Sequence, residues 1–143
     1  MTDIGLTHIA LPVTDVEASI AFYARYAKMQ VVHRRHDTLT NSTVVWLSDR
    51  TRPFAIVLIG VPTVTVRLSP FAHLGVGCAS REEVDQLCAQ ARAEGCLISG
   101  PEDAGVPVGY WAFLRDPDGH TLELAFGQEV GLTVESVPSQ SEV

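Results

Sequence analysis

The sequence predicts an α+β fold made of two tandem β-α-β-β-β units with curved mixed sheets. The first observation is an internal repeat, because residues 6–27 and residues 71–93 each read as a short apolar strand, a helix-capping signal and an amphipathic helix. The second observation is that His8 and His73 stand at matching places in the two copies, 65 residues apart. A chain of 143 residues is long enough to fold both copies around a shared core as one domain.

The first unit is expected over residues 1–60. Its opening strand alternates, with Leu11 on one face and His8 on the other. Thr14 and Glu17 then match a capping box, in which the two side chains satisfy free backbone amides at the start of a helix. The remaining elements are a helix to about Lys28, with Val16, Ile20, Tyr23, Ala24 and Ala27 on its inner face, and strands near residues 30–34, 43–48 and 54–59.

Residues 61–70 carry two prolines and no helical period, so we expect them to link the two units. The second unit is expected over residues 71–128, with a capping box at Ser80 and a helix that stops at Gly95. A polar tail is expected over residues 129–143, and its end is predicted to fray. The remaining strands are expected near residues 96–99, 110–115 and 121–126, with Asp116, Pro117, Asp118 and Gly119 in the turn between the last two.

The composition is that of an ordinary globular protein, with 46% hydrophobic and 19% charged residues. The formal charge of −7 and the absence of a basic cluster argue against a nucleic-acid partner. We expect no membrane partner and a cytoplasmic location, since the sequence has no signal-peptide pattern and no apolar run near the roughly 18 residues of a membrane span. The three cysteines lack Cys-x-x-Cys spacing and are expected to be reduced thiols.

Three side chains in the predicted strands could together bind a metal ion. His8 and His73 share their strand faces with the small residues Ala10 and Gly75, while the apolar neighbours point the other way. Glu123 follows the same rule in a strand that is otherwise apolar. A carboxylate buried without a partner is costly, and coordination to a cation removes that cost. Two imidazoles and one carboxylate leave positions open for substrate, which is typical of a catalytic metal site, so the expected cavity contains a metal.

Each of these side chains also has an ordinary structural role. A single histidine in a strand is most often hydrogen-bonded in the core or at the surface, and it is the agreement of all three positions that favours a metal site. His33 and His36 have a spacing that could serve a metal, but Arg34 and Arg35 between them indicate a solvated edge. His120 lies in a turn, and we expect it to be exposed.

The opening segment Leu6–Asp15 and the closing segment Arg115–Leu124, which reads RDPDGHTLEL, resemble the vicinal oxygen chelate superfamily. This superfamily includes glyoxalase I, extradiol dioxygenases, fosfomycin-resistance transferases, methylmalonyl-CoA epimerase and bleomycin-resistance proteins. The resemblance covers roughly residues 4–128. It implies one divalent ion (Zn, Ni, Co, Mn or Fe) bound by His8, His73 and Glu123. It also implies a homodimer in which His8 of one protomer faces His73 and Glu123 of the other.

Departures from the family patterns narrow the expected chemistry. Glyoxalase I has a fourth ligand where Val57 stands here, and valine cannot bind a metal. Extradiol dioxygenases have a tyrosine ten residues before the carboxylate, where Phe113 stands, and further acid–base histidines. Fosfomycin transferases have polar groups at the positions of Ala10 and Phe113. Antibiotic-sequestering members generally lack the metal ligands.

The expected substrate site is lined by Trp46, Phe71, Phe113 and Tyr110, so the substrate should have an apolar or aromatic body. Tyr110 and Glu102 are candidates for an acid–base group.

These observations favour an enzyme whose divalent ion acts as a Lewis acid on a small, partly apolar substrate with vicinal oxygens. Glu123 is then both a ligand and a possible catalytic base. Two alternatives remain open, namely an extradiol-type dioxygenase and a non-catalytic protein that binds a small molecule such as an antibiotic.

Overall fold

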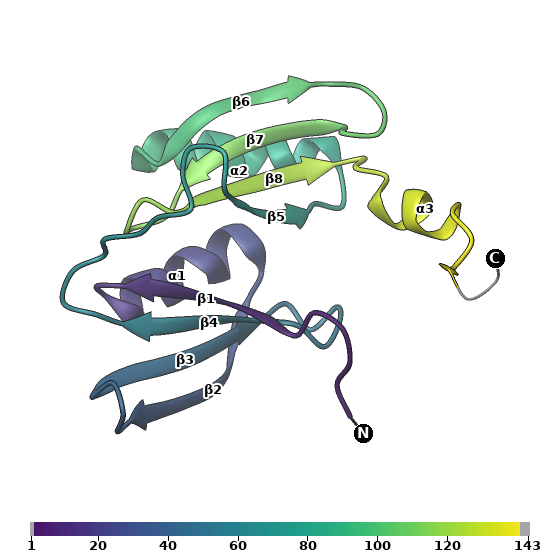
Figure 1. The fold of residues 1–143 in the computed structure, drawn as a ribbon. Helices are drawn as coiled ribbons and strands as arrows, with labels where there is room; N and C mark the ends of the chain where they lie inside the picture. The colour runs from purple at the N-terminus through teal and green to yellow at the C-terminus, as the bar shows by residue number, and fades with distance from the viewer. Residues whose placement is uncertain (1, 141–143) are drawn as a thin grey trace. The chain divides into compact units, whose positions relative to one another are not determined.

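The computed structural model describes residues 2–140 and divides the chain into two compact units. Unit 1 contains the chain up to Ala72 together with the turn Asp116–His120, and unit 2 contains His73–Arg115 and the chain from Thr121 onward. In each unit a helix covers one face of a four-stranded mixed sheet (Figure 1). The α+β fold of two β-α-β-β-β units is therefore confirmed.

Unit 1 has the strand order β1-β4-β3-β2, in which β1 and β4 are parallel and the other neighbours antiparallel. Helix α1 packs on one face of this sheet. A β-bulge interrupts the pairing of β2 between Val31 and His33. The elements are β1 (His8–Val13), α1 (Val16–Ala27), β2 (Gln30–Asp37), β3 (Ser42–Ser48) and β4 (Ala55–Gly60).

Unit 2 repeats this arrangement with the strand order β5-β8-β7-β6 and a parallel β5–β8 pair. The helix α3 (Val130–Glu135) forms inside the segment expected to be a tail, and none of its residues is buried. Residues 141–143, the end of that expected tail, lie outside the described residues. The other elements are β5 (Leu74–Gly77), α2 (Arg81–Glu94), β6 (Leu97–Asp103), β7 (Tyr110–Arg115) and β8 (Thr121–Phe126). No helix within residues 2–140 is long and apolar enough to cross a membrane.

The two helices begin differently from each other. Ser80 caps α2 as expected, since its hydroxyl accepts a hydrogen bond from the Glu83 amide at 3.1 Å. Helix α1 is capped by Asp15, which accepts from the Ala18 amide, so the expected cap at Thr14 is wrong. The Thr14 hydroxyl instead donates to the Asp118 carboxylate at 2.6 Å, a long-range partner that a local sequence pattern does not contain.

The inner face of α1 is rotated relative to the expected one. Tyr23 and Ala27 are buried as expected, whereas Ala24 is exposed. Phe22 and Tyr26 are buried in its place, with ring centroids 4.9 Å apart, because two aromatic rings bury far more apolar area than one alanine methyl.

The turn Asp116–His120 is bound into unit 1 by its polar side chains. The Tyr23 hydroxyl donates to Asp116 Oδ2 at 2.8 Å. Burial raises the pKa of Tyr23 far above its ordinary value and the Asp116 charge raises it further, so the hydroxyl remains a donor. His120 is 1% exposed, which corrects the expectation that it is solvated. Its Nδ1 accepts from the Leu68 amide, so Nε2 carries the proton and donates to the Pro12 carbonyl at 2.8 Å.

Candidate functional site

Glu123 and His73 lie together on the face of the unit 2 sheet that is opposite α2. Glu123 is 8% exposed, and its Oε2 lies 3.7 Å from His73 Nε2. The strand register places Glu123 between Gly75 of β5 and Phe113 of β7. A buried carboxylate next to an imidazole is the first part of the expected ligand set.

The space around this pair fits a bound cation. Two donors that each lie about 2.1 Å from a tetrahedral zinc ion are about 3.4 Å apart, close to the separation found here. A Cβ atom on Gly75 would lie 3.4 Å from Glu123 Oε2, in ordinary van der Waals contact, so Gly75 is the immediate neighbour of this carboxylate on β5. The donor set of one imidazole nitrogen and one carboxylate oxygen suits zinc and the neighbouring divalent metals.

Gln128, which the sequence analysis missed, orients the carboxylate. Its side-chain amide Nε2 donates to Glu123 Oε2 at 3.2 Å. Gln128 follows β8 after Gly127, which has a φ of 78°. No periodicity extends past the end of a strand, so the sequence carried no signal for this contact.

Replacing Gln128 by alanine should lower the affinity for a divalent ion by about tenfold, as expected when a residue that orients a ligand is lost. The fold should be unaffected, since Gln128 is exposed. Titration of the metal-free protein with Zn²⁺ or Ni²⁺ measures the change. Gln140→Ala, a substitution of another exposed glutamine, is the matched control, and equal affinity in both variants would show that Gln128 does not support the ligand.

Two aromatic side chains lie on the same sheet face as this pair. The Phe113 ring lies 5.0 Å from the His73 ring between centroids, and the Trp111 ring lies 4.7 Å from that of Phe113. Trp111 was not among the expected lining residues, although it stands two positions before Phe113 in β7 and therefore shares its face. The face is thus more apolar than the sequence analysis indicated.

Tyr110, which was expected beside the substrate, faces α2 instead. The Tyr110 hydroxyl donates to Asp85 of α2, and the Arg81 guanidinium lies 4.0 Å from the Tyr110 ring centroid. The hydrogen bond to Asp85 raises the pKa of Tyr110. Tyr110 therefore lies on the helix-covered side of the sheet, opposite Phe113. Phe71 precedes β5 and is 88% exposed.

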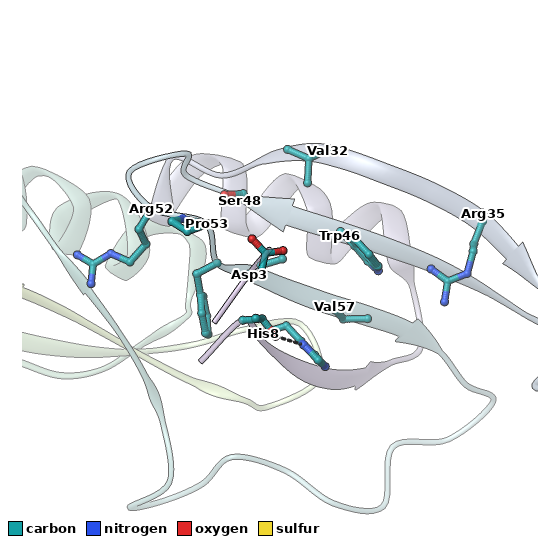
Figure 2. A pocket seen from close by; sticks show the side chains of 12 residues that line it. Asp3, His8, Val32, Arg35, Trp46, Ser48, Arg52, Pro53 and Val57 are labelled. Atoms are coloured by element: carbon teal, nitrogen blue, oxygen red, sulfur yellow. Dashed lines mark hydrogen bonds between the residues drawn. The ribbon is translucent and has the colours of Figure 1, made fainter. Parts of the chain in front are cut away.

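His8 lines a pocket in unit 1, on the sheet face opposite α1. The pocket has a volume of about 490 Å³, which is within the range of small-molecule sites. We call it the His8 pocket, and Figure 2 shows its lining. Trp46 and Val57 are paired neighbours in the sheet and lie in this pocket with His8, on the face that strand alternation predicted. Charged lining residues that the sequence analysis did not single out are Asp3, Arg35 and Arg52.

The His8 ring is partly oriented by its neighbour Thr7. Thr7 Oγ1 lies 2.9 Å from His8 Nδ1. When Nδ1 carries the proton and donates to this oxygen, Nε2 keeps the lone pair that a metal ion requires.

His8 belongs to unit 1, whereas His73 and Glu123 belong to unit 2. Among residues 2–140, no three His, Cys, Asp or Glu side chains are already clustered in a way that could hold a metal. His33 and His36 contact other side chains of unit 1. The His33 ring lies 4.7 Å from that of Trp46, and His36 Nε2 lies 3.1 Å from Asn41 Oδ1.

Comparison with known proteins finds similar sequences over most of the chain. The chain is 38% identical to the uncharacterized protein PA2024 of Pseudomonas aeruginosa, over 93% of this chain and 96% of that protein. It is 26% identical to a probable lactoylglutathione lyase of Vibrio cholerae, over 87% and 91% of the two chains.

Among solved structures, the fosfomycin resistance protein FosX of Listeria monocytogenes, in complex with Mn(II) and dihydroxypropylphosphonic acid, has the same fold with a TM-score of 0.71. The identity is 20%, over 93% of this chain and 99% of FosX. The sequence model of the Glyoxalase/Bleomycin resistance protein/Dioxygenase superfamily matches residues 5–124. With both halves of the repeat inside the matched region, the chain belongs to the glyoxalase/bleomycin resistance protein/dioxygenase superfamily.

Proposed function

We propose that this protein is a divalent-metal-dependent enzyme that acts on a small, partly apolar substrate with vicinal oxygen atoms. The observation that carries the proposal is the buried carboxylate of Glu123, 3.7 Å from His73 Nε2 and next to Gly75 of β5. His8 is the third ligand in this proposal. The ligands can come from one chain or from the two chains of the homodimer that the family resemblance implies.

The bound ion would act as a Lewis acid that polarises the substrate oxygens. The residues of the chain supply the surroundings for this chemistry. Gln128 holds Oε2 of Glu123, which leaves Oε1 to accept a proton as a base. The rings of Phe113 and Trp111 give this side of the site an apolar surface against which the body of the substrate would pack.

Phe113 favours this chemistry over ring cleavage. It is the register partner of Glu123 and has no hydroxyl, whereas an extradiol dioxygenase of the usual pattern has a tyrosine there. Val57, which lies in the His8 pocket, likewise offers no fourth ligand of the glyoxalase I type. A reaction related to that of lactoylglutathione lyase therefore has to proceed with three protein ligands.

The metal requirement tests this function. The protein stripped of metal is reloaded under argon with Ni²⁺, Co²⁺, Mn²⁺ or Fe²⁺ and assayed on a panel of hemithioacetals, epoxides, 2-hydroxyketones and catechols. We expect one substrate class to be turned over without oxygen and with more than one of these metals, because Lewis-acid catalysis requires no redox change at the ion.

Two other outcomes would contradict the proposal. Turnover of a catechol with Fe²⁺ alone and stoichiometric oxygen uptake identifies a dioxygenase. Tight binding of panel compounds without turnover under any condition identifies a binding protein. The bleomycin resistance proteins in the name of the superfamily suggest this second function.

A further inference from the structure

The His8 pocket contains more positive than negative charge, although the chain as a whole has a formal charge of −7. Arg35 and Arg52 are its basic residues, and Asp3 is its acidic residue. In Figure 2 the two arginines lie at different sides of the pocket, Arg52 next to Pro53 and Arg35 on the side of Trp46. A concave surface with excess positive charge raises the local concentration of anions.

Arg35 is the residue whose surroundings best suit a bound anion. Within residues 2–140 it forms no ion pair, whereas the adjacent Arg34 is paired with Glu17 of α1 at 2.7 Å. Asp37 lies two positions further along β2, but hydrogen bonds from Thr40 chiefly lower the pKa of its carboxyl, and Arg35 adds a smaller effect. The guanidinium of Arg35 is therefore free to donate to a ligand.

Trp46 provides an apolar surface next to this guanidinium. The Arg35 Cζ atom lies 5.9 Å from the centroid of the Trp46 ring, within the range of a cation–π contact. Trp46 is 40% exposed, and its strand neighbour Val57 lines the same pocket. A large exposed aromatic side chain beside an arginine is typical of a recognition surface.

We infer that Arg35 and Trp46 form a subsite for an anionic group, a carboxylate or a phosphonate, on a ligand with an aromatic or apolar body. The planar fork of the guanidinium matches the geometry of both anions, and the Trp46 ring provides a surface on which the body can stack. The inference rests on the proposed function in one respect: both place the substrate in the His8 pocket.

The test measures the binding of four probes to the metal-free protein by titration calorimetry. Three probes carry a naphthyl ring, namely 2-naphthoate, 2-naphthylphosphonate and the neutral 2-naphthamide. The fourth is benzoate, which has the carboxylate of 2-naphthoate on a smaller ring. We expect one or both naphthyl anions to bind about tenfold more tightly than 2-naphthamide, the size of effect of one hydrogen bond to a charged group. Arg35→Gln should remove this preference and leave the affinity for 2-naphthamide within about twofold. Trp46→Leu should weaken all naphthyl probes.

Arg34→Gln is the matched control. It removes the same charge from the adjacent position on β2, but on the side that faces α1. Its probe affinities should equal those of the wild type. If Arg35→Gln does not fold, Arg35→Lys should retain part of the preference, since lysine keeps the charge and loses the fork.

The inference is overturned if the anions and 2-naphthamide bind equally well to the wild type, or if Arg35→Gln keeps the preference. Since the protein is metal-free, the result does not depend on the metal assignment. If the protein binds no metal but Arg35→Gln still removes the preference for anions, the subsite is supported and only the metal assignment is wrong. If the protein binds a metal but Arg35→Gln keeps the preference for anions, only the subsite is rejected.

Discussion

Replacing Glu123 by alanine should abolish stoichiometric binding of a divalent ion. We expect the affinity to fall by more than a hundredfold, because loss of a residue that only supports a ligand already costs about tenfold to a hundredfold. Metal analysis after dialysis measures the stoichiometry. Thermal unfolding gives a second measurement, since a metal at a hundred times its Kd stabilises the wild type by about 2.7 kcal/mol, or about 10 °C in Tm. The variant should show no such shift.

The control for this prediction is Glu102→Ala. Glu102 is a register neighbour of Trp111 on the same sheet, but it is exposed and has no contact with Glu123 among the described residues. Its metal content should equal that of the wild type, because Glu102 is not one of the proposed metal ligands. One tight equivalent of metal retained by Glu123→Ala would show that the ligand assignment is wrong.

Much of the fold could be predicted because its signals are local and occur twice. Alternation in β1 assigns Leu11 to the core and His8 to the opposite face, and the structure buries Leu11 while His8 lines a pocket. The turn before β8 carries Asp, Pro and Gly, which specify a reversal through backbone geometry alone. The same parity argument predicts that Glu123 and His73 share a sheet face, and the parallel pairing of β5 with β8 brings them within 3.7 Å of each other.

The interactions that the sequence did not reveal are contacts between distant residues. Thr14 looks like a helix cap, but Asp118, 104 positions away, binds its hydroxyl. His120 looks like a solvated turn residue, but backbone groups of Pro12 and Leu68 bury it. Tyr110 looks like a lining residue, although its hydroxyl is bound by α2. The charge of the His8 pocket was missed for the same reason, because Arg35 and Arg52 come from separate segments.

Replacing Asp116 by alanine should destabilise the protein by about 3 kcal/mol or more, which corresponds to a fall in Tm of about 10 °C. Asp116 is 3% exposed and accepts three hydrogen bonds. Its Oδ1 accepts from the amides of Asp118 and His120, and its Oδ2 accepts from the Tyr23 hydroxyl. The substitution leaves these donors buried without an acceptor, and each such donor costs about 1–3 kcal/mol.

The reverse truncation, Tyr23→Phe, should cost less, about 1 kcal/mol, because it removes a donor and leaves the carboxylate with both backbone amides. Asp49→Ala is the matched control, since Asp49 accepts from Thr51 in an exposed turn of unit 1 and its loss should stay within about 1 kcal/mol. Urea unfolding of the four proteins gives the differences. The loss in the free energy of unfolding should be larger for Asp116→Ala than for Tyr23→Phe, because only the first substitution leaves buried donors unpaired. Equal losses for Asp116→Ala and Asp49→Ala would show that the buried hydrogen bonds stabilise the protein no more than those of an exposed turn.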